Sequence, residues 1–329
     1  MPQRGNLSVA IVGYGSTGRR HAENLGRLGV ARRVIVRRQH AANPAFTSPV
    51  DALVVHSVQQ SIAAGIDLAI VCNPTSLHIA TAREYLASGV AVLVEKPLAG
   101  ELAEAERFVA DAELSGVPAG MAYCLRYHPA YLLAHEYVCR GELGRMERVR
   151  AWFESYLPEW HPWEDYRQSY AARAELGGGV LPTLDHEIDF INWCFGPPPT
   201  TRGVSSRSGL LDADVDDEAT LTMHYGSFES EIRLSLSQRD RRRGFEMVGS
   251  EATLSFSFEQ QLLRLARRET GREEILWHEP EFDLNRMYLG LLDDALSAVA
   301  ARRQMPVPLW TGLHALRVAA AVQRSPGAA

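Results

Sequence analysis

The stretch that decides the fold runs from Leu7 to Gly18 and reads L-S-V-A-I-V-G-Y-G-S-T-G. Its first half, Leu7 to Val12, is a short apolar run of the kind found in strands buried on both faces. Its second half is Gly13-Tyr14-Gly15-Ser16-Thr17-Gly18, which fits G-x-G-x-x-G ahead of a helix expected over about Thr17 to Leu28. In such a turn the first glycine permits the bend, the second lets backbone approach a pyrophosphate, and the third allows helix and strand to pack. The stretch therefore predicts a dinucleotide-binding turn.

The same alternation of strand and helix continues through the first third of the chain. Further apolar strands are expected at Val34–Val36, Asp67–Cys72 and Val90–Val94. Helices are expected between them, one ending before Gly89 and another over about Leu102–Leu114. Short strands alternating with helices indicate right-handed βαβ units and a doubly wound parallel sheet.

The second half of the sequence has a different period. From about Arg202 to His278 apolar and polar residues alternate, as in Ala219-Thr220-Leu221-Thr222-Met223, which indicates antiparallel strands with one face buried. Helices are expected near 130–140, 285–303 and 311–324. The arginine-rich run at 239–243 is expected to be a solvated turn. We therefore expect an α/β chain with a dinucleotide-binding domain over residues 1–121 and a second, α+β domain over 122–329.

Composition excludes several classes of protein. The 329 residues carry a formal net charge of −6, whereas a nucleic-acid-binding protein needs clustered positive charge. The sequence contains no run of about 18 apolar residues, so no membrane span is expected. The N-terminus lacks the apolar core of a signal peptide. The four cysteines are scattered with no C-x-x-C pair, so neither disulfides nor a metal site is expected. A reducing cytoplasm is the expected compartment.

One basic residue differs from all the others. The 34 basic residues are 33 arginines and a single lysine, Lys96, within Glu95-Lys96-Pro97. Lys96 follows a predicted parallel strand, as Asn73 does, and ligands bind outside the carboxyl ends of such strands. Unlike arginine, lysine presents a compact ammonium that can lose its proton. The sequence thus marks Lys96 as a candidate for chemistry, with Pro97 as a candidate cis proline.

The end of the second strand bears on cofactor choice. About 20 residues past the glycines an Asp or Glu would hold the adenosine 2′-hydroxyl of NAD, but this chain has Arg37 and Arg38 there. Two guanidinium groups suit a 2′-phosphate. NADP is therefore the expected cofactor in preference to NAD.

Several segments together resemble the Gfo/Idh/MocA family, the relatives of glucose–fructose oxidoreductase and inositol dehydrogenase. They are the glycine turn, Glu95-Lys96-Pro97, Asn73-Pro74-Thr75-Ser76-Leu77-His78, Arg126-Tyr127-His128-Pro129, Gly141-Glu142-Leu143-Gly144, Gly177-Gly178-Gly179 through His186-Glu187-Ile188-Asp189, and Gly249-Ser250-Glu251-Ala252-Thr253-Leu254. The resemblance covers nearly the whole chain. It implies a nicotinamide-binding N-terminal domain and a C-terminal domain whose open, mostly antiparallel sheet pairs subunits.

The resemblance also implies site residues. The lysine of the E-K-P motif and the histidine after the glycines carry over to Lys96 and His186 as the catalytic pair. Members often have an aspartate four residues before that histidine, where this chain has Pro182. The expected cofactor contacts are Gly13, Tyr14, Gly15, Ser16, Thr17, Gly18, Arg37, Arg38, Cys72, Asn73, Pro74, Thr75, His78, Glu95, Lys96 and Pro97. From the sequence itself, Tyr123 and Arg126 are expected to contact substrate because they follow the presumed domain crossover. Trp163 belongs to an aromatic stretch suited either to lining a sugar pocket or to packing between domains. The other expected substrate contacts are Thr183, Asp185 and His186.

The chemistry of the two catalytic candidates is complementary. A histidine titrates near neutral pH and suits proton exchange with an alcohol, while a lysine ammonium stabilises a developing alkoxide. The reverse assignment, with Lys96 as the base, is also open. We expect hydride transfer between the nicotinamide and a CH–OH or keto carbon of a sugar, amino sugar or cyclitol. Alternatives are an NAD-dependent glycosidase, a reductase of non-sugar carbonyls and a cofactor-sensing protein. A homodimer or homotetramer is expected.

Overall fold

The computed structural model describes residues 6–37 and 51–324, and the chain divides into two compact units. The first unit is Met1–Cys124 with Asn285–Leu313, and the second is Leu125–Leu284 with His314–Ala329. The boundary predicted from the sequence lies between residues 121 and 122, with all later residues in the second domain. The structure instead returns 285–313 to the first unit, because α8 (Asn285–Ala300) packs against α1 (Ser16–Arg27).

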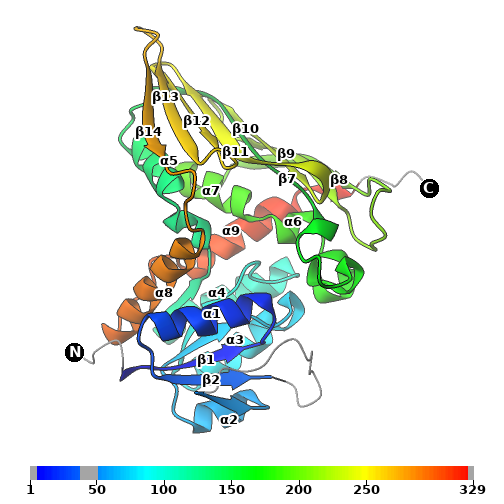
Figure 1. The fold of residues 1–329 in the computed structure, drawn as a ribbon, viewed down its shortest axis with the longest axis vertical. Coiled ribbons are helices and arrows are strands. Elements are labelled where there is room, and N and C mark those ends of the chain that lie inside the picture. Colours follow the sequence, from blue (N-terminus) through cyan, green and yellow to red (C-terminus); the bar gives the residue numbers. More distant parts are fainter. Residues whose placement is uncertain (1–5, 38–50, 325–329) are drawn as a thin grey trace. The chain divides into compact units, whose positions relative to one another are not determined.

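The first unit is built on a sheet of six parallel strands in the order β3-β2-β1-β4-β5-β6 (Figure 1). The order reverses between the neighbours β1 and β4, as in doubly wound dinucleotide-binding folds. Every residue of β1, β4 and β5 is buried, which explains their continuous apolar sequences. The strands are β1 (Ser8–Val12), β2 (Arg32–Val36), β3 (Ala52–Val55), β4 (Leu68–Val71), β5 (Ala91–Val94) and β6 (Ala119–Met121).

Helices cover both faces of this sheet. α1 and α8 lie against each other on one face, and Asn24 and Asn285 exchange two side-chain hydrogen bonds of 2.9 and 2.7 Å there. α2 (Val58–Ala63), α3 (His78–Ala87) and α4 (Leu102–Ser115) pack in succession on the other, and Figure 1 shows α1 and α2 on opposite sides. This confirms the predicted doubly wound parallel sheet.

The second unit is built on a sheet of nine strands in the order β14-β13-β12-β11-β7-β10-β9-β8-β15. Only the pairs β10–β7 and β15–β8 are parallel, so the predicted mostly antiparallel sheet is confirmed. The strands are β7 (Met146–Tyr156), β8 (Thr200–Ser206), β9 (Glu218–His224), β10 (Glu229–Ser235), β11 (Ser237–Gly249), β12 (Ala252–Ser257), β13 (Leu262–Arg267), β14 (Glu273–His278) and β15 (Gln323–Arg324).

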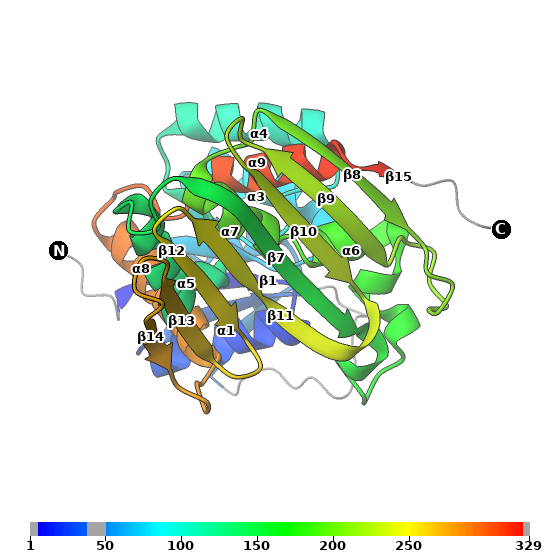
Figure 2. The same ribbon diagram turned by 90° about the horizontal axis from the view of Figure 1, so that it is seen from above.

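Helices lie on one face of the nine-stranded sheet only. α5 (Pro129–Cys139), α6 (Val180–Thr183) and α7 (His186–Phe195) pack on the inner face, where Tyr131 and Phe190 meet Phe245 and Phe256 of the strands. Figure 2 looks onto the opposite, outer face, which no described helix covers. The last helix of the chain is α9 (Leu309–Ala320).

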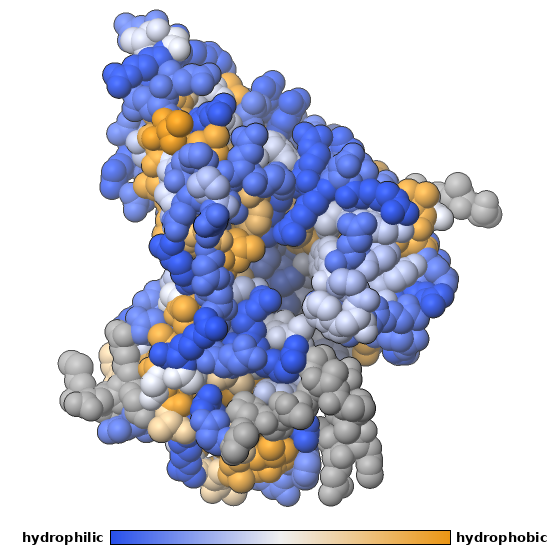
Figure 3. All heavy atoms as spheres, viewed as in Figure 1, coloured by the Kyte–Doolittle hydropathy of each residue, from blue (hydrophilic) through white to orange (hydrophobic). Residues whose placement is uncertain are grey.

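Alternating burial along the strands explains the period-two sequence. In β9 and β10 every second residue is buried, and the residues between them face outward. In the view of Figure 3, most surface side chains are hydrophilic. Hydrophobic side chains gather over the edge strand β14, where Ile275 is 63% exposed. The predicted solvated turn at 239–243 is wrong, since these residues belong to β11 and Arg243 is buried against α7.

Candidate active site

The glycine turn after β1 is shaped by close backbone packing. Gly13 has a φ of +90°, and a Cβ there would lie 2.7 Å from the carbonyl oxygen of Cys72 in the loop after β4. A Cβ on Gly18 would collide with the carbonyl oxygen of Gly13. A Cβ on Gly15, in contrast, would meet nothing within 4 Å. The outer two glycines are thus required by the fold, whereas the middle one leaves open space beside the turn.

That open space adjoins the N-terminus of α1, a helix of 12 residues. Within the described part of the chain, its cap Gly15 offers no side-chain hydrogen bond and its first turn contains no acidic residue. The first backbone N–H groups and the positive end of the helix dipole are therefore available to an anion. These residues fit the pyrophosphate of a dinucleotide, which would be held by Gly15, Ser16 and the backbone that follows.

Two further loops reach the same edge of the sheet. Gly13, Asn73 and Lys96 follow the carboxyl ends of β1, β4 and β5, which are neighbours. His78 ties the last two loops together, since its two ring nitrogens lie 2.8 Å from the carbonyl oxygens of Pro97 and Asn73. Burial lowers the pKa of His78, against the two carbonyls, which raise it. His78 thereby holds these loops in place.

The other predicted site residues near these loops differ in their burial and in their hydrogen-bond partners. Asn73 donates to Thr81 Oγ1 over 2.8 Å, and Thr75 is 4% exposed. The Lys96–Pro97 bond is cis, as the sequence suggested. Tyr123, predicted as a substrate contact, is wholly buried in the first unit.

Glu95 has a buried partner that sequence reasoning missed. His21 of α1 places Nε2 2.7 Å from Glu95 Oε1, and the backbone N–H of Lys96 donates to Glu95 Oε2 over 3.2 Å. Burial raises the pKa of the Glu95 carboxyl, but the His21 hydrogen bond and the charge of Lys96 outweigh burial and leave the pKa below its ordinary value. Tyr288 of α8 meets the His21 ring edge-on at 6.0 Å. The signal available in the sequence was a histidine on the buried face of the first helix.

The arginines chosen for cofactor recognition lie at the end of β2. Arg37 is the last described residue before the gap, its N–H donates to Val55 O, and its carbonyl lies 3.0 Å from His56 Nδ1. Arg38 lies outside the described residues.

In the second unit, His186 is the first residue of α7 and is half-buried. Thr183 closes α6, and Asp185 precedes α7; both are buried. Glu187 of α7 accepts a 2.7 Å hydrogen bond from Arg243 Nε of β11. The side chains of this pair are 2% and 8% exposed, so the carboxylate that follows His186 is fixed by a desolvated ion pair.

A second buried ion pair holds the next turn of α7. Arg126 donates to both oxygens of Asp189, over 2.9 and 2.7 Å, and its guanidinium lies 5.1 Å from the ring of Trp193. Burial raises the pKa of Asp189, while the charge and hydrogen bonds of Arg126 lower it. Arg126, expected to contact substrate, therefore has its guanidinium engaged with α7.

The aromatic segment before the glycine run has both buried and exposed members. Trp160 donates from Nε1 to Ser155 Oγ over 3.1 Å and stacks on Phe153. Trp163, a predicted substrate contact, is 67% exposed and lies 5.2 Å from the ring of His161.

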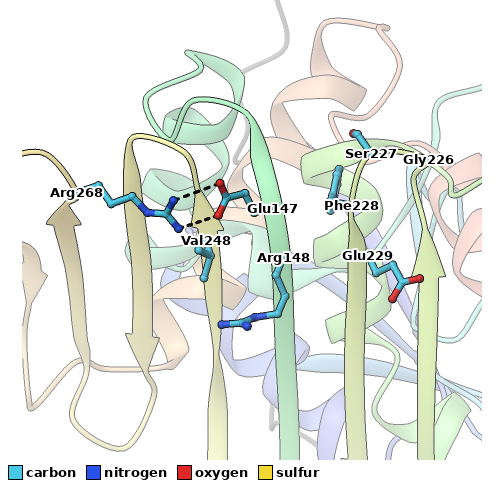
Figure 4. A pocket seen from close by; sticks show the side chains of 8 residues that line it. All are labelled: Glu147, Arg148, Gly226, Ser227, Phe228, Glu229, Val248 and Arg268. Carbon is cyan, nitrogen blue, oxygen red and sulfur yellow. Dashed lines mark hydrogen bonds and ion pairs between the residues drawn. The ribbon is translucent and has the colours of Figure 1, made fainter.

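A surface pocket in the second unit involves none of the predicted site residues. It lies at the start of β7 beside the β9–β10 turn (Figure 4). Glu147 and Arg268 pair across it over 2.7 Å. Its lining consists of Glu147, Arg148, Gly226, Ser227, Phe228, Glu229, Val248 and Arg268.

Residues 6–37 and 51–324 offer neither a metal-binding cluster nor a membrane-spanning helix. No cluster of three or more His, Cys, Asp and Glu side chains in these ranges could hold a metal ion. No helix in them is long and apolar enough to cross a membrane.

Comparison with known families defines the class of protein. Residues 7–123 match the oxidoreductase family with an NAD-binding Rossmann fold, and residues 131–255 match the Gfo/Idh/MocA C-terminal domain. The chain belongs to the Gfo/Idh/MocA family, and its first unit is an NAD-binding Rossmann fold. The predicted resemblance is thereby confirmed.

Individual relatives are more distant. The chain is 29% identical over 191 residues to the myo-inositol dehydrogenase Hyg17 of Streptomyces leeuwenhoekii, covering 58% of this chain and 56% of that protein. It is 30% identical over 177 residues to trans-1,2-dihydrobenzene-1,2-diol dehydrogenase of Bos taurus, covering 52% and 50%. The match therefore spans about half the length of these curated relatives.

Solved structures match over nearly the whole chain. A levoglucosan dehydrogenase in complex with NADH and levoglucosan superposes with a TM-score of 0.82 at 19% identity, covering 96% of this chain and 95% of that one. At this identity the similarity shows the fold alone.

Proposed function

We propose that this protein is a nicotinamide-dependent oxidoreductase that transfers hydride to or from a CH–OH or keto carbon of a carbohydrate-like substrate. One observation carries the proposal: the glycine turn, Asn73 and Lys96 follow three adjacent parallel strands, at the edge where the strand order reverses. Open α/β sheets bind ligands at that edge. The bound nicotinamide supplies or accepts the hydride.

Lys96 and His186 are the proposed catalytic residues. The Lys96 ammonium stabilises negative charge on the substrate oxygen, and His186 exchanges the hydroxyl proton. His186 begins α7, which the buried Arg243–Glu187 and Arg126–Asp189 pairs anchor. Family members often have an aspartate four residues before the histidine, where this chain has Pro182. We therefore propose that the nearby Thr183 and Asp185 contact the substrate beside His186.

NADP is the proposed cofactor in preference to NAD. The proposal rests on Arg37, at the end of β2, where no acidic residue is available for a ribose 2′-hydroxyl. A guanidinium there would pair with the 2′-phosphate.

The substrate class rests on the named relatives. The similarity to a myo-inositol dehydrogenase and to the 1,5-anhydro-D-fructose reductase of Ensifer adhaerens supports a cyclitol or sugar derivative. The dihydrobenzenediol dehydrogenase supports a second candidate, a non-sugar diol or its carbonyl form.

A panel of sugars, amino sugars, cyclitols and dihydrodiols, assayed with both nicotinamide cofactors, tests the activity and the substrate class. Steady gain or loss of the reduced cofactor absorbance is expected with a member of this panel. A glycosidase would consume substrate with no net cofactor turnover, and that result would refute the oxidoreductase proposal.

We also propose assembly into a homodimer or homotetramer through the outer face of the nine-stranded sheet. Across that face Glu246, Arg150 and Glu231 are direct cross-strand neighbours of alternating charge. Figure 4 shows the Arg148 side chain on β7, the strand that also carries Arg150. Such an alternating row can meet its own copy about a two-fold axis. Light scattering should give a multimer for the wild type and a smaller mass for Arg150→Glu; a monomeric wild type would refute this.

The proposed compartment is the reducing cytoplasm, because the four cysteines are scattered along the sequence with no C-x-x-C pair.

A further inference from the structure

Arg241 of β11 differs from the arginines beside it. Its guanidinium carbon lies 5.9 Å from the ring centre of Phe153 and 5.8 Å from that of Phe258. Arg243, two residues further along the strand, stands over the same two rings at 4.4 and 5.3 Å. Both guanidinium groups therefore lie against the same pair of rings, and the ion pair with Glu187 places Arg243 beside α7.

The two arginines have different partners. Arg243 is bound to Glu187, whereas no carboxylate of the described residues lies within ion-pair distance of Arg241. The carboxylate whose charge acts on Arg241 is Glu259, and that side chain already accepts the backbone N–H of Arg243 over 2.7 Å. Arg241 keeps solvent access, so an incoming anion can reach it.

The surroundings of Arg241 disfavour its charge. Partial burial lowers the pKa of Arg241, and the neighbouring positive charge of Arg243 lowers it further. The Arg241 guanidinium lies against two aromatic rings and beside a second guanidinium, and it forms no ion pair with a carboxylate of the described residues. A bound oxyanion would therefore stabilise its charge. Perturbed charges of this kind concentrate at functional sites.

The position of Arg241 relates it to the substrate. Arg243 contacts Glu187, the residue after His186, so the first turn of α7 adjoins Arg243. Arg241 contacts the same two rings, Phe153 and Phe258, as Arg243 does, which places its guanidinium near that turn. A sugar-sized molecule at His186 can therefore extend a substituent to Arg241.

We propose that Arg241 binds an oxyanion substituent of the substrate, a carboxylate or a phosphate, so that the protein acts on acidic rather than neutral carbohydrate-like molecules. This inference rests on the proposed function for the location of the reacting carbon. Arg243 neutralises Glu187 and keeps that carboxylate from repelling the anion, while Arg241 supplies a forked donor suited to carboxylate or phosphate.

Equilibrium binding by calorimetry tests the inference on the full-length protein with saturating NADPH. The probes are D-glucose, D-glucuronate and D-glucose 6-phosphate, which share a ring and differ in their charged group. One acidic probe should bind at least about 10-fold more tightly than glucose, since a charge-assisted hydrogen bond contributes that much. Preference for glucuronate or for the phosphate identifies the anion. Equal affinity for all three overturns the inference.

Two variants assign the effect to one side chain. Arg241→Gln should lower the affinity for the preferred acid about 10- to 100-fold and leave glucose and NADPH binding unchanged. Arg242→Gln, the neighbour in the same strand without these ring contacts, should bind all probes as the wild type does. If Arg241→Gln retains the acid affinity, or loses NADPH affinity instead, the inference is wrong.

The outcome is separable from that of the proposed function, because binding is measured without turnover. Hydride transfer on a neutral substrate with no acid preference would overturn only the role of Arg241. Tight, Arg241-dependent acid binding without hydride transfer to any tested substrate would overturn only the activity.

Discussion

His21 Nε2 and Glu95 Oε1 lie 2.7 Å apart in the interior of the first unit, and this contact links α1 to the loop that carries Lys96. The same carboxylate accepts the backbone N–H of Lys96 through its second oxygen. The helix that begins at the glycine turn and the loop of the proposed catalytic lysine are thus held by one buried carboxylate.

Acid stability should report on this contact. The folded-state pKa of Glu95 is below its ordinary value of about 4.3, so its stabilising effect is complete above that value and is lost as pH falls through the folded pKa. The free energy of unfolding, from urea titrations over a pH series, should therefore fall on the acid side. Glu95→Gln should flatten that part of the curve. The exposed Glu113→Gln serves as control, and an unaltered curve for Glu95→Gln would show that the contact does not govern acid stability.

The three glycines of the turn should separate folding from cofactor binding. Gly15→Ala should change the free energy of unfolding by no more than about 1 kcal/mol, because its Cβ meets open space. It should nevertheless weaken NADPH binding about 10-fold or more, because that space is where the pyrophosphate approaches. Gly18→Ala should destabilise the fold by about 1–3 kcal/mol, because its Cβ meets the Gly13 carbonyl.

Gly100→Ala is the matched control for the turn, since its Cβ would also meet open space, away from the glycine motif. Thermal unfolding and fluorescence titration with NADPH measure the two properties. Undiminished NADPH affinity in Gly15→Ala would contradict the placement of the pyrophosphate.

The Arg126–Asp189 pair should behave as an anchor of α7. Arg126→Met leaves the Asp189 carboxylate buried and unpaired, so a loss of about 3–5 kcal/mol of unfolding free energy is expected. The double variant Arg126→Met with Asp189→Leu removes both charges and should regain most of that loss. Urea unfolding of the wild type, the two single variants Arg126→Met and Asp189→Leu, and the double variant gives the coupling free energy between the two side chains. If the single variant is fully stable and only KM rises, Arg126 is a substrate contact as the sequence suggested.

Arg37 should govern the choice between nicotinamide cofactors. Arg37→Gln is expected to lower kcat/KM for NADPH about 10-fold, because a charge-assisted hydrogen bond to the 2′-phosphate is lost, while kcat/KM for NADH is retained. Arg32→Gln, at the other end of β2, is the control. Equal loss with both cofactors, or a wild type that prefers NADH, would contradict the NADP assignment.

The sequence predicted the elements whose signals are local. The run Leu7–Val12, the glycine turn and the period-two strands each carry their pattern within a few residues, so the parallel character of the first sheet and the mostly antiparallel character of the second followed from the sequence. The strands β3, β6 and β7 were not predicted. The packing of α8 on α1 did not follow, because it joins residues 261 positions apart, such as Asn24 and Asn285. Residues 239–243 were predicted as a turn for the same reason. They belong to a strand because Arg243 pairs with Glu187 of α7 and the end of the segment pairs with β7, and neither partner can be identified from the charged sequence.

For the candidate site, the sequence likewise identified local motifs but not contacts between distant residues. Motif positions such as Gly15, Lys96 and His186 could be named, since each stands at a fixed place after a strand or before a helix. The partners of nearby side chains could not, because His21 with Glu95 and Arg126 with Asp189 meet only in the folded chain. Arg126 was assigned to the substrate because it follows the presumed domain crossover, whereas in the structure its guanidinium donates two hydrogen bonds to Asp189.

Lys96 and His186 are proposed to act in the same chemical step, and a double-mutant cycle on kcat measures whether they do. Lys96→Met and His186→Asn should each lower kcat about 10²- to 10⁴-fold with NADPH still bound, and the double variant should be little slower than the worse single one. Multiplicative losses would mean that the two residues act independently. Full turnover in both single variants, with cofactor affinity intact, would contradict the account.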